Sequence, residues 1–351
     1  MGERADHQGD LLAAGGLQVS VHGRGVVLVL ARADVERLLT MPKCIALMEE
    51  ALTSLARGEV VLPLRTVLRV PDSPNVFALM PAHSSALGAL GAKLITVFPG
   101  NHGTGRDSHQ GVVALFDATH GGIVALMDAA SITAIRTAAV SAVATRTLSN
   151  AAAKTLAILG AGVQGGTHME AMRHARRFEQ VRLWSRTRAH AEALAARART
   201  SGGPEILVAD DAESAVRGAE VVCTVTASKE PVLRGAWLGP GAHVNAVGAS
   251  IPTARELDTD AVRKARLFVD RRESALNEAG DVLIPMREGA FGEEHIRAEL
   301  GDVLVGKAPG RATAQDVTLF KSLGIAVEDL ACARFLYDEA RTTSAGTWVE
   351  L

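Results

Sequence analysis

The sequence predicts an α/β protein in which a doubly wound parallel sheet of the Rossmann type accompanies a second, discontinuous α+β domain. Three observations lead to this fold class. The chain has 351 residues, more than the roughly 100 to 200 of a typical domain. Strand-like and helix-like segments alternate between residues 155 and 270, as they do in βαβ units. A glycine-rich turn, GAGVQG, follows the first strand of that alternation, as in dinucleotide-binding domains.

Composition and charge favour a small molecule as the partner. The chain is 48% hydrophobic and 3% aromatic with a formal net charge of −2, which gives no field to attract nucleic acid or an anionic membrane. No apolar run reaches the ~18 residues that span a bilayer, and the first residues lack the basic start and apolar core of a secretion signal. We therefore expect a flexible leader over residues 1–25 and a cytoplasmic protein. Cys44, Cys223 and Cys332 lack paired spacing, so we expect reduced core residues rather than disulfides or a zinc site.

The first region, residues 26–130, is predicted to be rich in strands. VVLVL, residues 26–30, has the apolar run of a strand, and Asp34 then stands where it can cap a helix ending at Gly58. Short β-like runs separated by turn residues follow within VVLPLRTVLRV, NVFALMPAH, GAKLITVFPG and QGVVALFDATHGGIVALMD.

The second region, residues 131–316, carries the alternation expected of a Rossmann domain. It begins with ITAIRTAAVSAVATRTL, which is rich in small residues at helical spacing. The later segment VTLFKSLGIAVEDLACARFLY has a long helical pattern and is predicted to come too late to add a strand. We expect residues 317–351 to pack back on the first region, which makes that domain discontinuous.

The turn GAGVQG has the glycine spacing of a dinucleotide site. Gly160 permits the tight turn, Gly162 lets a pyrophosphate approach the backbone, and Gly165 allows close packing of the following helix. The alternative interpretation is a purely structural glycine turn.

The end of the next strand favours NADP(H) over NAD(H). An NAD-selective site places an acidic residue there to bind the ribose hydroxyls, but this strand ends in Ser185, Arg186, Thr187 and Arg188. The two arginines suit a 2′-phosphate. The alternative is that they are solvated residues at the start of a helix, and NAD(H) is the second choice of cofactor.

Three cations interrupt apolar segments of the first region and its boundary. They are Arg65 in PLRTVLR, Lys93 in GAKLITVF and Arg136 in ITAIRTAAVS. A buried cation is costly unless it meets an anion, and this set suits a substrate carboxylate. Taken singly, each is equally consistent with an internal salt bridge.

Other catalytic classes find little support. The residues His102, Asp107, His109 and His120 cluster in a glycine-rich span, but their irregular spacing favours solvated loop residues over a metal site. The sequence also contains neither a G-x-S-x-G nucleophile motif nor H-E-x-x-H, which disfavours a hydrolase.

Six separated segments of the sequence are GAKLITVF, ITAIRTAAVSAVATRTL, LAILGAGVQG, VRLWSRT, HVNAVGASIPTARELD and VTLFKSLGIAVED. In this order they resemble motifs of the ornithine cyclodeaminase/mu-crystallin family. The resemblance extends from about Val26 to Tyr337. The resemblance implies a substrate-binding and dimerisation domain formed by residues 26–130 and 317–351 around a Rossmann domain, and a homodimer. It also implies catalytic and carboxylate-binding roles for the three cations, Arg65, Lys93 and Arg136.

The resemblance further assigns residues to the substrate and the cofactor. Met80 and Ser250 join the three cations at the substrate. The cofactor-binding set comprises Thr137, Gly160, Gly162, Val163, Gln164, Ser185, Arg186, Thr187, Arg188, Thr226, Val247 and Gly248.

Two departures separate this chain from the cyclodeaminases of the family. They place an aspartate after NAVG to handle the substrate amino group, but NAVGASIP carries Ser250 there and Ala249 before it. A family glutamate before the Leu-Met-Pro segment is replaced by Ala78. Because a cyclodeaminase must activate a second amine, the chain looks most similar to the mu-crystallin and ketimine reductase branch, which uses NADPH.

We therefore expect reduction by NADPH of a cyclic imino acid, such as pyrroline-2-carboxylate or piperideine-2-carboxylate, to the cyclic amino acid. Lys93, or a water that it holds, is the candidate proton donor. Three alternatives stay open: an ornithine or lysine cyclodeaminase with its base supplied elsewhere, an NAD(P)-dependent alanine or other amino-acid dehydrogenase, and a non-catalytic NADP-binding protein.

Overall fold

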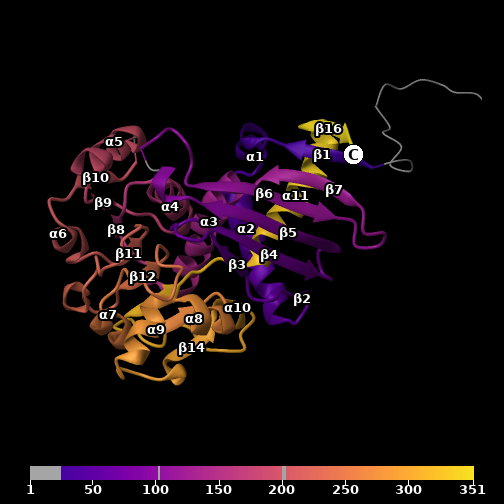
Figure 1. Cartoon of the computed structure of the whole chain (residues 1–351). Coiled ribbons are helices and arrows are strands. Elements are labelled where there is room, and N and C mark those ends of the chain that lie inside the picture. Colours follow the sequence, from indigo (N-terminus) through magenta and orange to yellow (C-terminus); the bar gives the residue numbers. More distant parts are fainter. Residues whose placement is uncertain (1–24, 102, 200–202) are drawn as a thin grey trace, which may run out of the picture.

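The computed structural model describes residues 25–101, 103–199 and 203–351. The predicted leader, except for Gly25, and His102 lie outside these residues. Two sheets of eight strands each organise the chain, side by side in the molecule (Figure 1). We call them sheet A, built from both ends of the described chain, and sheet B, built from the middle and one later segment.

Sheet A is mixed, with the strand order β16-β1-β7-β6-β5-β4-β2 and with β3 paired to β4. β1 and β7 run parallel, and the other neighbouring pairs are antiparallel. The strands predicted in the first region are all present. Their bounds are β1 (Val26–Leu30), β2 (Val60–Val61), β3 (Thr66–Arg69), β4 (Val76–Ser84), β5 (Ala89–Val97), β6 (His109–Phe116), β7 (Ile123–Asp128) and β16 (Thr347–Glu350).

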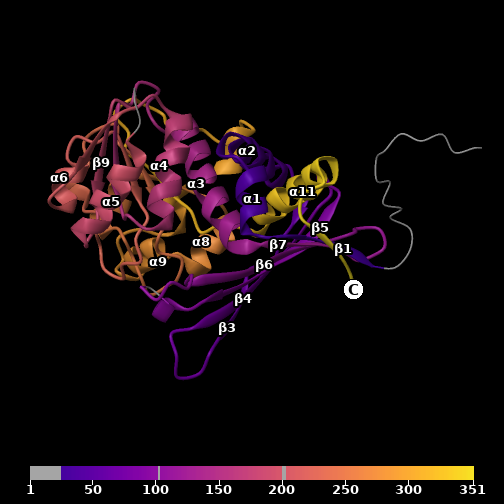
Figure 2. The same cartoon turned by 90° about the horizontal axis from the view of Figure 1, so that it is seen from above.

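Within the described part of the chain, helices cover one face of sheet A and leave the other face open (Figures 1 and 2). The covering helices are α1 (Arg32–Leu38), α2 (Met41–Ala56) and α11 (Ala326–Thr343). Gly91 on β5 allows α11 to approach closely, because a Cβ there would lie 2.9 Å from Cδ1 of Leu330. Lys93 is two residues further along β5, so its side chain points to the same covered face.

The single helix predicted from Asp34 to Gly58 is two helices. Asp34 is not the N-cap residue, which is Ala31; it lies in the first turn of α1, where its carboxylate accepts a hydrogen bond of 3.3 Å from the backbone N–H of Ala31. The chain breaks at Thr40, and Pro42 lies in the first turn of α2. Proline lacks a backbone donor and is tolerated in the first turn of a helix, which explains the restart.

The helix α3 (Ala129–Leu148), predicted from its small residues, lies between the two sheets. Its alanines Ala138, Ala139 and Ala142 are fully buried, since α3 packs against α2 on one side and α4 on another. A helix with apolar residues all round is typical of such a buried position. Asp128 begins it by accepting a hydrogen bond of 2.8 Å from the N–H of Ser131.

Sheet B is parallel throughout, with the order β10-β9-β8-β11-β12-β15-β13-β14. Successive residues of β8 pack into two different cores, Leu156 and Ile158 into one and Ala157 and Leu159 into the other. The sheet is therefore covered on both faces, and the predicted doubly wound α/β fold is confirmed.

The elements of sheet B and its helices follow one another along the chain. The strands are β8 (Thr155–Leu159), β9 (Gln180–Trp184), β10 (Glu205–Val208), β11 (Val221–Thr224), β12 (His243–Ala246), β13 (Arg266–Val269), β14 (Ile296–Glu299) and β15 (Thr318–Lys321). The helices are α4 (Val163–Ala175), α5 (Arg188–Ala198), α6 (Ala212–Val216), α7 (Thr259–Lys264), α8 (Arg272–Glu278), α9 (Gly280–Arg287) and α10 (Leu300–Leu304), with short 3₁₀ turns at Pro99–Asn101, Gly235–Trp237 and Glu293–His295.

The prediction that residues 315–337 come too late to add a strand is wrong. Thr318–Lys321 forms β15, which lies inside sheet B between β12 and β13, and the helix begins only at Ala326. The expected boundary at residue 317 therefore cuts off one strand of the Rossmann sheet. The four residues of β15 are all buried, and burial on both faces removes the polar alternation that identifies a strand.

Other expectations concern the cysteines, the glycine-rich loop and the membrane. Cys44, Cys223 and Cys332 are buried and free, as predicted. In the loop, Asp107 pairs with Arg32, and no group of three metal-ligating side chains occurs among the described residues. None of the helices within the described part of the chain is long and apolar enough to cross a membrane.

Candidate active site

The carboxyl edge of sheet B gathers most of the predicted site residues. The strand order reverses beside β8, whose neighbours are β9 and β11, and ligands of doubly wound sheets bind at such a reversal, outside the carboxyl ends of the strands. The glycine turn follows β8, Thr226 follows β11, Gly248 follows β12 and Gly324 follows β15.

The three glycines of the turn meet three different steric demands. Gly160 has φ +121°, and a Cβ there would lie 2.6 Å from the carbonyl oxygen of Val225. A Cβ on Gly165 would lie 2.3 Å from the carbonyl oxygen of Gly160. Gly162 precedes the first residue of α4, and a Cβ there would meet no atom within 4 Å. The open approach at the helix start fits a pyrophosphate group.

The first turn of α4 is tied to α3 through a buried histidine. Nδ1 of His168 lies 2.8 Å from the carbonyl oxygen of Gln164, and Nε2 lies 2.9 Å from Oγ of Ser141. Burial lowers the pKa of His168 to about 4, so the ring is neutral and bridges the two helices. Oε1 of Gln164 is buried without a hydrogen-bond partner among the described residues, whereas Val163 is exposed. Thr137 lies one turn before Ser141 on α3 and is buried.

At the end of β9 the two arginines differ. Arg188 is the first residue of α5, and its guanidinium pairs with Asp210 at 2.6 Å and with Glu192 at 2.9 Å. Both ion pairs are exposed to solvent and therefore weak, so the role of Arg188 at a 2′-phosphate stays a prediction. Arg186 is exposed and takes part in no ion pair within the described part of the chain. Ser185 precedes Arg186, and Thr187 is the cap residue of α5.

A buried glutamate, which the sequence analysis missed, joins the loops after β11 and β12. Glu256 accepts hydrogen bonds from the N–H and Oγ1 of Thr226, at 2.6 and 2.7 Å, and from the N–H of Gly248 at 2.6 Å. Val247, between β12 and Gly248, donates its N–H to the carbonyl oxygen of Thr224 at 3.0 Å. Thr226 and Gly248 are thus brought together, whereas their order along the chain gave no sign of a shared partner.

Glu256 is itself supported by a buried ion pair. Oδ1 of Asp281 accepts the N–H groups of Glu256 and Leu257 at 2.7 and 3.0 Å, and Oδ2 lies 3.0 Å from Nζ of Lys321 on β15. Burial, followed by the nearby charge of Asp281, raises the pKa of Glu256, and Lys321 opposes that effect.

Lys93 and Arg136 share one buried carboxylate. Asp329 places Oδ2 2.8 Å from Nζ of Lys93 and Oδ1 3.2 Å from Nε of Arg136. Nη1 of Arg136 lies 2.9 Å from Oε2 of Glu328, and Nζ of Lys93 donates to Oγ1 of Thr133 at 3.4 Å. Burial lowers the pKa of Lys93 to about 8, although Asp329 opposes the shift. Burial alone would lower the pKa of Arg136, but Asp329 and Glu328 raise it.

Arg65 reaches the same place from the start of β3. Its Nη2 donates to the carbonyl oxygens of Leu323 and Gly324 at 3.0 and 2.9 Å, and its Nε lies 2.8 Å from Oε2 of Glu278. Gly324 has φ +73°, and a Cβ there would lie 2.2 Å from Nη1 of Arg136. Arg65 and Arg136 therefore meet on the backbone of Gly324, at the carboxyl end of β15.

Met80 joins this group, and Ser250 does not. Met80 is buried on β4 opposite Lys93 in the strand register, and it lines a small hollow together with Arg65 and Gly324. Ser250 is exposed in the loop after β12, and no hydrogen bond among the described residues connects it to the three cations.

The acidic partners of the cations were also missed. Asp270 is buried after β13 and accepts the N–H groups of Leu323 and Gly324; the others are Glu278, Glu328 and Asp329. A charge beside an apolar run was the signal that identified the cations. The same signal is present in LFVD, which ends at Asp270, and in IAVED, which contains Glu328 and Asp329.

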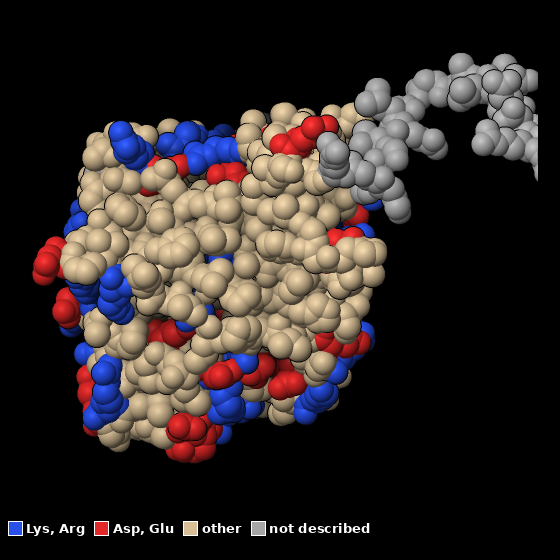
Figure 3. All heavy atoms as spheres, turned by 45° about the vertical axis from the view of Figure 1, so that its right-hand side comes forward, with Lys and Arg blue, Asp and Glu red and all other residues tan. Residues whose placement is uncertain are grey.

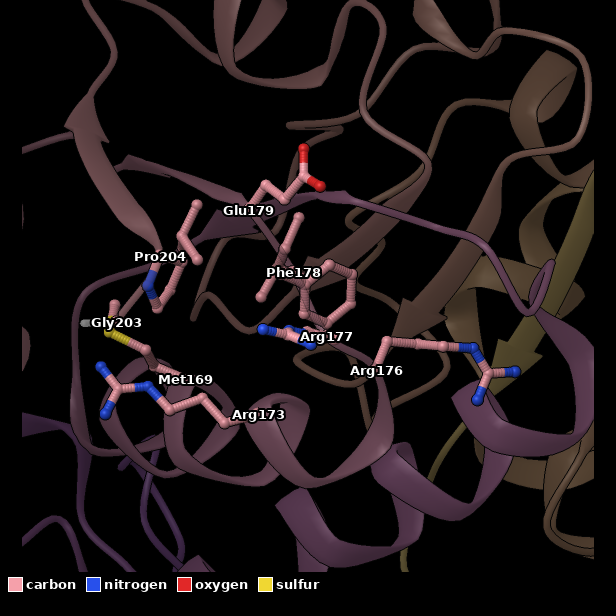
Figure 4. A pocket seen from close by; sticks show the side chains of 10 residues that line it. Met169, Arg173, Arg176, Arg177, Phe178, Glu179, Gly203 and Pro204 are labelled. Atoms are coloured by element: carbon pink, nitrogen blue, oxygen red, sulfur yellow. The ribbon is translucent and has the colours of Figure 1, made fainter.

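A larger hollow lies at the opposite edge of sheet B (Figure 4). It is lined by Arg173 and Met169 of α4, by Phe178 and Glu179 before β9, and by Pro204 before β10. These positions are at the amino ends of the strands. The hollow is therefore separate from the glycine turn and the three cations.

Comparison with known proteins identifies the family. The model of the ornithine cyclodeaminase/mu-crystallin family matches residues 26–344. The ketimine reductase mu-crystallin of Mus musculus is 46% identical over 294 residues, which are 83% of this chain and 90% of the mouse protein. The structure of Thermococcus litoralis Delta(1)-pyrroline-2-carboxylate reductase in complex with NADH and L-proline has a TM-score of 0.90 and 36% identity, covering 92% of this chain and 100% of that one.

A second solved structure, an archaeal alanine dehydrogenase dimer with bound NAD, has a TM-score of 0.88 and 28% identity and covers 93% of this chain and 99% of that one. The family match and the mouse relative each extend over most of the chain. This chain belongs to the ornithine cyclodeaminase/mu-crystallin family.

Proposed function

We propose that this chain catalyses the NADPH-dependent reduction of a cyclic imino acid, such as pyrroline-2-carboxylate or piperideine-2-carboxylate, to the cyclic amino acid. The observation that carries the proposal is the pair of buried cations, Lys93 and Arg136, held by Asp329 next to the carboxyl end of β15. A negatively charged imino acid needs such cations. The relatives named for imine reduction support this class of substrate.

The chain's own residues account for binding and protonation. The substrate carboxylate binds between Arg65 and Arg136, whose guanidinium groups both lie against Gly324. The nicotinamide of the bound cofactor supplies the hydride. Because an imine accepts hydride more readily when its nitrogen is protonated, a nearby acid is needed. Lys93, with its pKa lowered to about 8, is an ammonium ion at neutral pH and can give up that proton.

The preference for NADPH rests on the end of β9. The segment that follows β9, Ser185 to Arg188, contains no carboxylate that would bind ribose hydroxyls and repel a 2′-phosphate. Arg186 is exposed and suits the phosphate. Arg186→Ala should raise the KM for NADPH about 10-fold, the loss of a charge-assisted hydrogen bond, without changing the KM for NADH. Arg188→Ala is the matched control and should have the smaller effect.

We infer that two copies pair through the open face of sheet A. This face carries exposed apolar side chains on adjacent strands, namely Leu68, Phe77, Leu79, Leu90 and Val112. Figure 3 shows few charged side chains over a broad area on this side of the molecule. Phe77→Asp should convert the dimer to a monomer in light scattering after gel filtration. Leu207→Asp, at an exposed apolar position of sheet B, should leave the dimer intact.

One alternative gains support from the structure. Glu278 places a carboxyl group beside Arg65, and burial raises its pKa. Such a group could accept a proton from the second amine of ornithine or lysine, although Ala78 and Ser250 lack a carboxyl. A cyclodeaminase would release ammonia without net oxidation of the cofactor.

The proposal is tested by following NADPH oxidation at ~340 nm, the nicotinamide absorption band. Five- and six-membered cyclic ketimine carboxylates are compared with pyruvate plus ammonia, and ornithine and lysine are assayed for ammonia release. Saturable oxidation with a cyclic ketimine supports the proposal. Oxidation that requires ammonia assigns an amino-acid dehydrogenase, and ammonia from ornithine or lysine assigns a cyclodeaminase; each of these results rejects it.

A further inference from the structure

Glu328 stands apart from the other carboxyl groups around Arg136. Its side chain is fully buried, and only Oε2 has a partner, Nη1 of Arg136 at 2.9 Å. Oε1 is buried without a hydrogen-bond partner in the described part of the chain. In contrast, Asp329 contacts a cation through each oxygen, and Asp270 accepts three backbone N–H groups.

The cluster contains more acidic groups than cations. Three cations, Arg65, Lys93 and Arg136, meet four carboxyl groups, those of Asp270, Glu278, Glu328 and Asp329. A substrate carboxylate would add one more negative charge. Uncompensated buried charge is strongly unfavourable, so protonation of a carboxyl group in the cluster becomes more favourable when the substrate is bound. Glu278 keeps part of its side chain exposed to solvent, whereas Glu328 is fully buried and has one oxygen without a hydrogen-bond partner in the described part of the chain.

Glu328 also occupies a donor that the substrate needs. Arg136 donates hydrogen bonds from Nε to Asp329 and from Nη1 to Glu328. An ionised Glu328 competes for Nη1 and repels an incoming carboxylate, whereas a neutral one binds Nη1 weakly and adds no charge. Binding of the substrate and ionisation of Glu328 therefore oppose each other.

We propose that Glu328 takes up one proton when the substrate carboxylate binds to Arg136, so that Glu328 sets the pH range in which the enzyme binds its substrate. The proton comes from solvent and stays on the Glu328 carboxyl group until the carboxylate product leaves. The inference rests on the proposed function for the identity of the anion. Glu328 is a positioning residue, since it acts through Arg136.

The surroundings of Glu328 agree with this role. The charged groups that face it are Arg136 on α3, Asp270 after β13, Asp329 on its own helix and Lys93 on β5. Burial raises the pKa of Glu328 to about 8, the two aspartates add to the shift, and the two cations oppose it. Substrate binding is therefore linked to protonation of Glu328 and weakens as the pH rises. Below that pKa Glu328 is already neutral and binding takes up no proton, whereas above it each pH unit weakens binding tenfold.

The experiment is calorimetric binding of pyrrole-2-carboxylate to the enzyme–NADPH complex, in buffers of different ionisation enthalpy. This probe has the carboxylate of the substrate and no imine to titrate. One pH unit above the pKa of Glu328 the wild-type protein should take up about 0.9 proton, and one unit below it about 0.1. Glu328→Gln should take up clearly less, since only Lys93, whose pKa is also about 8, then titrates in this range, and its affinity should fall less steeply with pH. The control Glu299→Gln, at a half-buried carboxyl on β14, should behave like the wild type.

Several outcomes would overturn the inference. Uptake as large in Glu328→Gln as in the wild type would assign the proton to Lys93, and absence of uptake in the wild type would remove the linkage. If the probe does not bind, infrared spectroscopy near neutral pH decides: the wild type must show a protonated carboxyl band that is lost in Glu328→Gln, and identical spectra of the two proteins would overturn the inference. Proton uptake without turnover of any cyclic ketimine would reject the proposed function and leave this inference intact.

Discussion

Asp329 is the residue whose neutralisation should damage the site most. The substitution Asp329→Asn removes the carboxylate shared by Lys93 at 2.8 Å and Arg136 at 3.2 Å. All three side chains are buried, and removing one partner of a buried ion pair costs about 3–5 kcal/mol. The two pairs share one carboxylate, so their contributions are not additive, and we expect a loss of about 5 kcal/mol in the free energy of unfolding.

The same substitution should reduce activity more than it reduces cofactor binding. Without Asp329, the pKa of Lys93 falls further, since Asp329 is the main group that raises it, and less of the proton donor is present at neutral pH. Arg136 also loses one of its two fixed contacts, and a misplacement of ~1 Å can cost about 100-fold in rate. We expect kcat/KM for the imino acid to fall at least 100-fold by this estimate, with the Kd of NADPH nearly unchanged.

The measurements are urea unfolding, steady-state kinetics and NADPH fluorescence. Asp338→Asn, on the same helix α11, is the matched control, because its ion pair with Arg334 is exposed and contributes about 0–1 kcal/mol. The reasoning would be refuted if both variants lost the same stability. It would also be refuted if the affinity for NADPH fell in proportion to kcat/KM.

Three further predictions concern glycines and pH. Gly324→Ala adds about 1–2 kcal/mol of backbone strain and pushes Arg136 away, since its Cβ would lie 2.2 Å from Nη1, so kcat/KM should fall at least about 10-fold. Gly162→Ala should leave the melting temperature unchanged, because the Cβ would meet no protein atom within 4 Å, and should raise the Kd of NADPH about 10-fold, because a pyrophosphate is expected to approach the backbone there. Gly165→Ala should lower the melting temperature, because its Cβ would lie 2.3 Å from the carbonyl oxygen of Gly160. If Lys93 is the proton donor, kcat should fall tenfold per pH unit above about 8.

Gly58→Ala has the same positive φ, +78°, with no atom within 4 Å of the added Cβ, so it measures the backbone strain alone. Equal losses in Gly58→Ala and Gly324→Ala would show that Arg136 is not displaced. Unchanged NADPH affinity in Gly162→Ala would contradict the assignment of the turn to the pyrophosphate. A kcat independent of pH up to about two units above the pKa of Lys93 would exclude that proton donor.

The sequence was informative wherever a residue type answers a local physical demand. The turn at Gly160 was predictable because the backbone nearby requires a glycine at Gly160 and at Gly165, whereas Gly162 leaves the start of α4 open. Lys93 and Arg136 were recognisable because a cation in an apolar segment needs a partner. Their shared partner, Asp329, was not recognisable from the sequence. It is 193 residues from Arg136 along the chain, and no spacing rule connects the two.

The strand β15 was not predicted from the sequence. Thr318–Lys321 has four residues, too few for a period to be recognised, and it precedes a long helix. Gly324, with φ +73°, separates the strand from that helix and was the one local sign of a break. The place of β15 in the sheet depends on β12 and β13, which flank it and pair with it in parallel. Both strands are distant from β15 along the chain, so the local sequence does not reveal this position.

The position of β15 also constrains how the protein is made. During synthesis, β13 and β12 emerge long before the strand that must separate them, so the two cannot complete their hydrogen bonding until residue 321 has been produced. Until then both present unpaired edges, which favour aggregation, and the long sequence separation slows closure. A fragment ending at residue 316, cut at the apparent boundary between domains, would keep those edges permanently. We therefore expect that transplanting the cofactor-binding unit into another protein would require the C-terminal segment as well.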